Sequence, residues 1–104
     1  MAEMIILEFD GFSEAEYNKV NDILGVNMAK GEGDIPEGLL SHTAGTVDGG
    51  FVVIEVWDTK AHQEEFLTSR LRPALHEAGV TGPPRRSEWA KLHAHHTAHT
   101  HAAV

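Results

Sequence analysis

The sequence predicts an α+β domain in which the elements follow the order strand, helix, strand, strand, helix, strand. Four short segments are rich in strand-forming residues, and two longer segments carry apolar residues at helical spacing. Between the second and third strands, Asp48-Gly49 is a strong hairpin signal because both residues tolerate positive φ angles. Two right-handed crossovers then give a ferredoxin-like βαββαβ fold, an antiparallel sheet with both helices on one face.

Local signals place each element along the chain. The expected elements are a strand at 4–9, a helix at 14–24, strands at 39–44 and 51–57, a second helix at about 59–78 and a strand at 86–92. Gly25 and Gly79 end the two helices, and Pro73 is expected to kink the second one because it removes a helical hydrogen bond. Residues 25–38 form a glycine-rich acidic loop, which we interpret as a mobile cover over a site or an interface.

Length and composition exclude several classes of protein. The 104 residues amount to one domain, placed at residues 1–92, followed by a histidine-rich tail at 93–104. The absence of cysteine excludes disulfides and thiolate chemistry and fits a cytoplasmic protein. The formal charge of −8 disfavours nucleic-acid partners, because an acidic surface repels phosphates. The apolar runs are too short to span a membrane, and the N-terminus lacks the basic segment of a signal peptide.

The strand at 51–57 predicts that the protein is a homodimer. Both of its faces are largely apolar, so one face stays uncovered when the helices take the other. The aliphatic face is expected beneath the helices: Val52, Ile54 and Val56. The alternate, mixed face is expected against a second copy of the chain, so that two sheets close a barrel: Phe51, Val53, Glu55 and Trp57.

A histidine and a carboxylate are predicted to meet on this mixed face. A two-residue hairpin loop places His42 opposite Glu55, and a longer loop keeps both on one face because the strand period is two. His42 oriented by Glu55 is a candidate general base, and the alternative is a structural pair that satisfies two buried polar groups. The residues expected to shape an apolar pocket for a hydrophobic small molecule are Tyr17, Phe51, Val53, Trp57 and Trp89.

Several motifs carry a resemblance to a known superfamily. They are Pro36-Glu37-Gly38-Leu39-Leu40-Ser41-His42, Val56-Trp57-Asp58-Thr59 and Arg70-Leu71-Arg72-Pro73-Ala74-Leu75 before Glu77-Ala78-Gly79-Val80. Over roughly residues 3–92 the chain resembles the dimeric α+β barrel superfamily. It looks closest to antibiotic-biosynthesis-monooxygenase-like proteins, particularly small uncharacterised actinobacterial members. The resemblance implies the fold and a homodimer. It leaves the reaction open, because one fold supports many functions.

The leading functional hypothesis is a small cavity-forming enzyme that acts on a hydrophobic molecule through the His42 base. The resemblance implies cofactor-free oxygenation, isomerisation or dehydration as its reaction, and no cofactor is then expected. The alternative is a non-catalytic module that binds a ligand or a metal.

Heme binding is a further alternative, drawn from the heme-degrading branch of the superfamily. The iron-ligating histidine of that branch falls on His76, which matches. Its tryptophan falls on Phe66 and its strand asparagine falls near Glu8 or Phe9, which are departures. We therefore interpret His76 as a histidine on the helix surface rather than as a heme ligand.

The C-terminal tail holds five of the eight histidines: His93, His95, His96, His99 and His101. Neutral imidazoles at this density bind Zn²⁺, Ni²⁺ or Cu²⁺. The alternatives are a solvated tail with incidental affinity for metals or a tag-like extension. The sequence therefore predicts metal binding by the tail, with no recognisable catalytic metal set.

Overall fold

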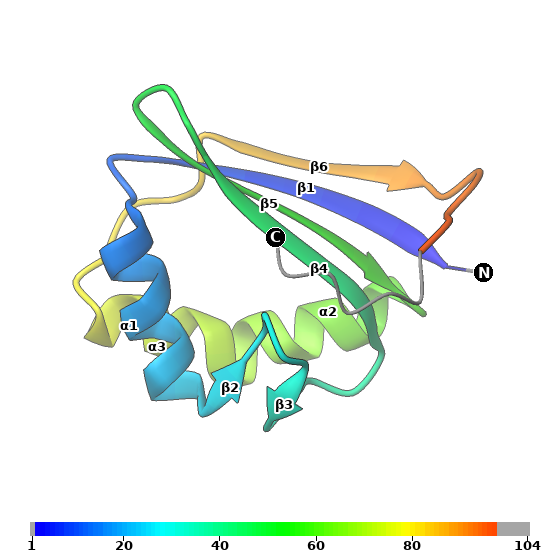
Figure 1. Ribbon diagram of the computed structural model, residues 1–104, viewed down its shortest axis with the longest axis horizontal. Coiled ribbons are helices and arrows are strands. Elements are labelled where there is room, and N and C mark those ends of the chain that lie inside the picture. Colours follow the sequence, from blue (N-terminus) through cyan, green and yellow to red (C-terminus); the bar gives the residue numbers. More distant parts are fainter. Residues whose placement is uncertain (1, 98–104) are drawn as a thin grey trace.

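A computed structural model describes residues 2–97 and confirms the α+β ferredoxin-like fold (Figure 1). The main sheet is antiparallel, with strand order β4-β5-β1-β6. Its strands are β1 (Glu3–Asp10), β4 (Leu39–Val47), β5 (Gly50–Trp57) and β6 (Arg86–Lys91). One face is covered by α1 (Glu14–Leu24) and by a second helical run. None of the helices in the described part of the chain is long and apolar enough to cross a membrane.

The second helical run has three parts rather than one kinked helix. They are α2 (Lys60–Phe66), the π-helical segment η1 (Leu67–Leu71) and α3 (Arg72–Glu77). Pro73 has no N–H to donate to the Ser69 carbonyl, so the α-helical pattern cannot continue through this turn. The hydroxyls of Thr68 and Ser69 instead bond to carbonyls of the preceding turn. The predicted interruption at Pro73 therefore takes the form of a π-helical segment just before it.

The acidic loop at residues 25–38 contains a small two-stranded sheet that the sequence analysis did not predict. Strands β2 (Val26–Asn27) and β3 (Glu32–Gly33) pair with each other beside the C-terminus of α1. Arg70 of η1 ties this segment to the helices, because its guanidinium donates to the carbonyls of Leu24 at 3.1 Å and Asp34 at 2.7 Å.

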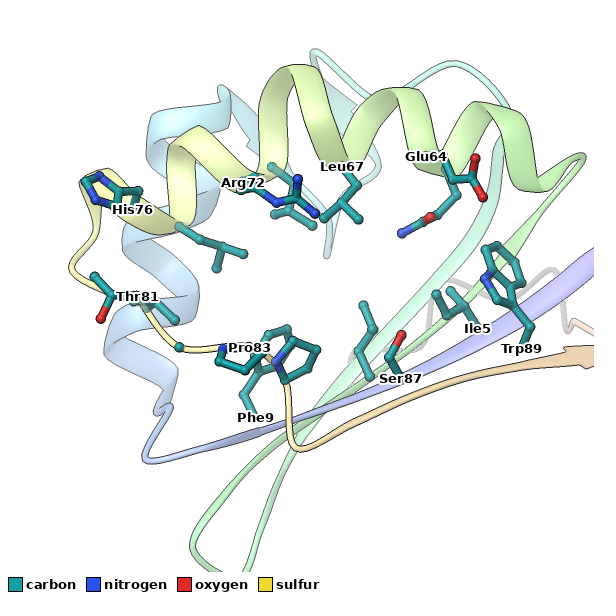
Figure 2. Close-up of a pocket in the computed structure, with 17 residues that line it drawn as sticks. Ile5, Phe9, Glu64, Leu67, Arg72, His76, Thr81, Pro83, Ser87 and Trp89 are labelled. Atoms are coloured by element: carbon teal, nitrogen blue, oxygen red, sulfur yellow. The ribbon is translucent and has the colours of Figure 1, made fainter.

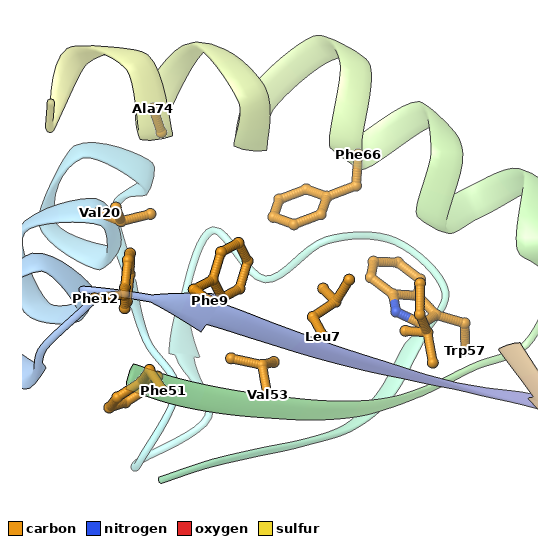
Figure 3. Packing of buried hydrophobic residues seen from close by; sticks show 10 residues of the cluster. Leu7, Phe9, Phe12, Val20, Phe51, Val53, Trp57, Phe66 and Ala74 are labelled. Atoms are coloured by element: carbon orange, nitrogen blue, oxygen red, sulfur yellow. The ribbon is translucent and has the colours of Figure 1, made fainter. Parts of the chain in front are cut away.

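The two faces of β5 are the reverse of the expected assignment. The mixed set lies beneath the helices as part of the core (Figure 3): Phe51, Val53, Glu55 and Trp57. The aliphatic set occupies the open face, where Val52 and Ile54 are half-buried. The large rings decide the outcome, because the Trp57 ring reaches Phe66 of α2 at a centroid distance of 5.8 Å. The prediction that the mixed face forms the subunit interface is therefore wrong.

The hairpin register agrees with the prediction from Asp48-Gly49. Val47 pairs with Gly50, and Gly49 has a positive φ of 73°. Counting outward, His42 lies opposite Glu55, as expected. A bulge between Leu39 and Ser41 shifts the register only beyond this pair.

Candidate functional site

Three side chains from three elements form a hydrogen-bonded chain between the sheet and α1. The hydroxyl of Tyr17 on α1 lies 2.6 Å from Nε2 of His42 on β4. The other ring nitrogen of His42, Nδ1, lies 2.8 Å from Oε2 of Glu55 on β5. The predicted contact of His42 with Glu55 is present, and Tyr17 extends it into what we call the Tyr17–His42–Glu55 chain.

Trp57 closes the inner end of this chain, and an ionised Glu55 would accept from both Trp57 and His42. The indole Nε1 donates to Oε1 of Glu55 at 3.0 Å, and the Trp57 side chain is completely buried. Oε2 of Glu55 then accepts from Nδ1–H of His42, which leaves Nε2 as the acceptor for the Tyr17 hydroxyl. Every donor has an acceptor while the imidazole is neutral.

The environment keeps Tyr17 in its phenol form. Burial raises the pKa of Tyr17 above its ordinary value of 10.0, and the negative charge of Glu55 raises this pKa as well. The ring is held in place because it stacks on the His42 imidazole at 5.9 Å and contacts the Phe51 ring at 5.0 Å. Tyr17 therefore enters the chain as a proton donor with a fixed orientation.

Two hollows lie on either side of Tyr17 and His42. An inner cavity of about 50 Å³ has mostly apolar walls, with Tyr17, His42 and Glu55 among its few polar residues. On the outer side, a concavity of about 530 Å³ is lined by Tyr17 and His42 together with Met28 and Ala29 of the loop at 25–38. The interpretation of that loop as a cover over a site agrees with this position.

A larger cavity of about 630 Å³ lies between the helical run and the β1–β6 half of the sheet (Figure 2). Its walls are mostly apolar, with Ile5 and Phe9 from the sheet and Leu67 from η1 among them. It shares four wall residues with the 50 Å³ inner cavity: Leu7, Phe9, Leu71 and Leu75. These four side chains therefore separate the large cavity from the Tyr17–His42–Glu55 chain.

The residues predicted to shape one pocket lie in different places. Tyr17 and Phe51 line the outer concavity, and Val53 lines the inner cavity. Trp57 is sealed in the core and contacts Glu55 rather than any open space. Trp89 lines the large cavity, away from His42.

The residues present do not fit a heme-degrading site. His76 is exposed at the rim of the large cavity (Figure 2). Phe66 is buried in the core against Trp57, and Glu8 is held by Arg85 and Arg86 on the open face of the sheet. Phe66 is not among the residues that line the large cavity, and the strand position falls either on Glu8 of the open face or on Phe9 of the cavity wall, neither of which is an asparagine.

The metal-binding prediction for the tail falls partly outside the described residues. His93, His95 and His96 are exposed and lie beyond the end of β6. Within residues 2–97, no three histidine, aspartate or glutamate side chains are grouped to hold a metal ion. His99 and His101 lie outside the residues that the structure describes, so metal binding by the tail stays a prediction.

Two features of the site were missed by sequence reasoning. The first is the contact of Tyr17 with His42, which links residues 25 positions apart in the chain. The second is Gln63, which is buried in the wall of the large cavity at 3% exposure. A signal for Tyr17 was present, because it is the first apolar position of the α1 stripe and the only tyrosine of the chain.

Comparisons with known proteins support the fold. No protein-family model matches the chain, and no curated protein matches it. The chain is similar to a solved structure of a putative antibiotic biosynthesis monooxygenase from Chloroflexus aurantiacus. The TM-score is 0.64 at 12% identity, covering 93% of this chain and 98% of that chain.

Two further solved structures are similar at low identity. A protein of unknown function from Nitrosomonas europaea gives a TM-score of 0.60 at 19% identity, covering 95% of this chain and 94% of that chain. SnoaB, a cofactor-independent oxygenase from Streptomyces nogalater, gives 0.53 at 17% identity, covering 95% and 97%. At these identities the likeness establishes the shared fold.

Proposed function

We propose that this protein is an enzyme that removes a proton from a hydrophobic small molecule, with His42 as the general base. The observation that carries the proposal is the Tyr17–His42–Glu55 chain, with links of 2.6 Å and 2.8 Å. A carboxylate behind an imidazole fixes its tautomer and stabilises the imidazolium that forms when the base accepts a proton. An ordinary surface ion pair of histidine and glutamate would lack the hydrogen bond from Tyr17 to the histidine and the hydrogen bond from Trp57 to the glutamate.

The proton moves through Tyr17. Its hydroxyl accepts the substrate proton while its own proton passes to Nε2 of His42, and Glu55 offsets the charge on the resulting imidazolium. The raised pKa of Tyr17 supports this sequence, because the residue begins as a phenol and does not accumulate as a phenolate. The reverse transfer returns the proton and restores the neutral chain.

The substrate occupies the large cavity. Its volume of about 630 Å³ is typical of small-molecule sites, and its walls are mostly apolar. The reacting end enters the inner cavity of about 50 Å³ beside Tyr17 and His42. Leu71 and Leu75 line both the large cavity and the inner cavity, so rotation of either side chain connects the two cavities.

Proton removal is the step common to three reactions. The carbanion is consumed by O₂ in an oxygenation, is reprotonated at another carbon in an isomerisation, or expels hydroxide in a dehydration. We place oxygenation without a cofactor first, and the similarity in fold to the cofactor-independent oxygenase SnoaB supports that order. The other two reactions use the same residues.

Deuterium exchange under anaerobic conditions tests the proton step apart from any later reaction. Anthrone is a suitable probe, because it is apolar and its methylene hydrogens are acidic. We expect the protein to accelerate exchange of these hydrogens, followed by NMR, and His42→Ala to abolish the acceleration. His62→Ala is the matched control, since it removes a half-buried histidine that takes no part in the Tyr17–His42–Glu55 chain. Equal exchange rates with the wild-type protein and with His42→Ala would contradict the proposal.

We also infer that two copies of the chain pair through the open face of the sheet. The half-buried apolar residues of that face share one side in the observed register: Met4, Ile6, Val52, Ile54 and Ala90. Within residues 2–97 no helix covers this side, and a sheet with an uncovered apolar face needs a partner. Stable dimers of this kind bury more than about 1,000 Å².

Sedimentation velocity tests the dimer. The wild-type protein should sediment as a dimer, and Ile54→Glu should give a folded monomer because it places a charge in the centre of the face. Leu40→Glu is the matched control, since Leu40 is 59% exposed. A wild-type monomer at micromolar concentration contradicts the inference.

A further inference from the structure

The large cavity has a free cation at its rim. Of the four arginines in the chain, three are engaged in ion pairs: Arg70, Arg85 and Arg86. Arg72 has no ion pair with any residue between 2 and 97, and its side chain lines the large cavity beside Leu67 (Figure 2). An arginine without an ion pair in the described part of a chain with a formal charge of −8 is available to a ligand.

A second polar group lies deeper in the same cavity. Gln63 is 3% exposed, and its amide makes no hydrogen bond to another described residue. Every fully enclosed side-chain nitrogen or oxygen in the described part of the chain has a partner. The Gln63 amide must therefore be open to the cavity, where a ligand can satisfy its donor and acceptor.

The polar groups are separated along the cavity. Glu64 and Trp89 lie at one end, and His76 and Thr81 lie at the other (Figure 2). Arg72 and His76 are four residues apart, so they project from neighbouring turns of α3. Arg72 lies between these two ends, beside Leu67, and Glu64 at one end carries a carboxylate that would repel an anion.

We propose that the large cavity binds a hydrophobic acid whose carboxylate or phenolate pairs with Arg72. The arginine fork matches a carboxylate in two parallel hydrogen bonds, and the apolar walls take the body of the ligand. The amide of Gln63, in the wall of the same cavity, can hydrogen-bond to a hydroxyl or carbonyl elsewhere on the ligand. This inference rests on the proposed function in placing the substrate in this cavity, and it names the class of that substrate.

Binding of a matched pair of probes tests the inference without requiring turnover. Anthracene carboxylate and the corresponding carboxamide have the same shape and differ in charge, and their fluorescence reports binding. The carboxylate should bind at least about tenfold more tightly than the carboxamide to the wild-type protein. Arg72→Gln should remove this preference, whereas Arg72→Lys should retain part of it.

Two controls locate the effect. Lys19→Gln removes one positive charge from the exposed surface of α1 and should leave the preference unchanged. Ser87→Trp fills the cavity from an exposed position on β6 and should abolish binding of both probes, with circular dichroism confirming the fold. Equal affinity for the two probes, a preference unchanged in Arg72→Gln, or no binding of either probe would each overturn the inference.

Failure of the inference about the ligand can be distinguished from failure of the proposed proton-removal function. Arg72 variants report only on binding, and His42 variants report on proton removal. If Arg72→Gln leaves the preference intact while His42→Ala still abolishes exchange, the substrate class is wrong and the base is right. If the preference depends on Arg72 but His42→Ala leaves exchange unchanged, the cavity binds an acid without the proposed chemistry.

Discussion

The molecule contains two histidine–carboxylate pairs of almost equal length in different surroundings. Nδ1 of His42 lies 2.8 Å from Glu55, and Nδ1 of His62 lies 2.7 Å from Asp58. The side chains of the first pair are 11% and 6% exposed, and those of the second pair are 36% and 43% exposed. Distance alone therefore does not separate a candidate catalytic pair from a structural one.

The second ring nitrogen shows what each pair can do. Nε2 of His42 bonds to Tyr17, so a proton can travel from one side of the imidazole to the other. Among residues 2–97, the charged partner of His62 Nε2 is the exposed carboxylate of Glu37 at 3.9 Å. The Asp58 hydrogen bond raises the pKa of His62 above its ordinary value of 6.5. The protonated form of His62, which lies between the carboxylates of Asp58 and Glu37, is therefore favoured. The pairs therefore differ in their second partner, a buried phenol for His42 and a distant exposed carboxylate for His62.

The exposed pair also positions the turn before β4. The amide of Asp58 donates to the carbonyl of Gly38 at 2.9 Å, and Gly38 has a φ of 88°. A Cβ added at Gly38 would lie 2.5 Å from both Asp58 and His62 side-chain atoms. The pair and the glycine thus fit together at the start of the strand that carries His42.

The largest expected difference between the pairs is catalytic. With a carbon acid that the protein deprotonates, His42→Ala should lower the exchange rate by about 10²–10⁴-fold, the range for loss of a general base. His62→Ala should leave it within experimental error. Rate measurements on both variants, with the fold checked by circular dichroism, decide between a catalytic and a structural role for the buried pair.

Stability should separate the pairs next. Glu55→Ala leaves two buried donors, on His42 and Trp57, without an acceptor, at about 1–3 kcal/mol for each. Asp58→Ala removes a solvent-screened partner and should lower the free energy of unfolding much less than Glu55→Ala does. Urea denaturation of both variants measures the contrast, and equal losses would mean that burial does not distinguish the pairs.

Alkaline titration sharpens the account of the buried chain. The pKa of Tyr17 is raised in the folded state, so this contribution to stability is fully present below pH 10.0 and is lost as the pH rises through the folded-state pKa. Tyr17 is the only tyrosine, so ultraviolet absorbance of the phenolate reports it alone. Glu55→Gln should lower this pKa because a negative charge is removed, and Tyr17→Phe should remove the associated pH dependence of stability.

The smallest expected effect concerns the exposed pair. His62 should titrate above 6.5 by NMR, and Asp58→Asn should lower its pKa because the favourable carboxylate is gone. The stabilisation is present below the unfolded-state value and is lost as the pH rises through the folded-state value. An unchanged His62 titration in Asp58→Asn would show that the pair is not formed in solution.

The sequence predicted the strand and helix order because periodicity and turn signals are local properties. The register that joins His42 to Glu55 also followed from one local feature, the Asp48-Gly49 turn. The orientation of β5 did not follow, since both of its faces are apolar and side-chain alternation cannot tell which one the helices cover. The Tyr17 contact and the Arg70 tie depend on packing between distant elements, which no local pattern records.

The placement of the two tryptophans gives the protein two independent optical reporters. Trp57 is completely buried with its indole N–H on Glu55, which also bonds His42, so its emission should respond to the charge of the His42 imidazole and resist quenching by acrylamide. Trp89 lines the large cavity and lies beneath Lys60, whose ammonium is 5.5 Å from the ring centroid. Its emission should respond to whatever fills the cavity. Single Trp→Phe variants would therefore let ligand entry and proton movement be timed separately in one unlabelled protein.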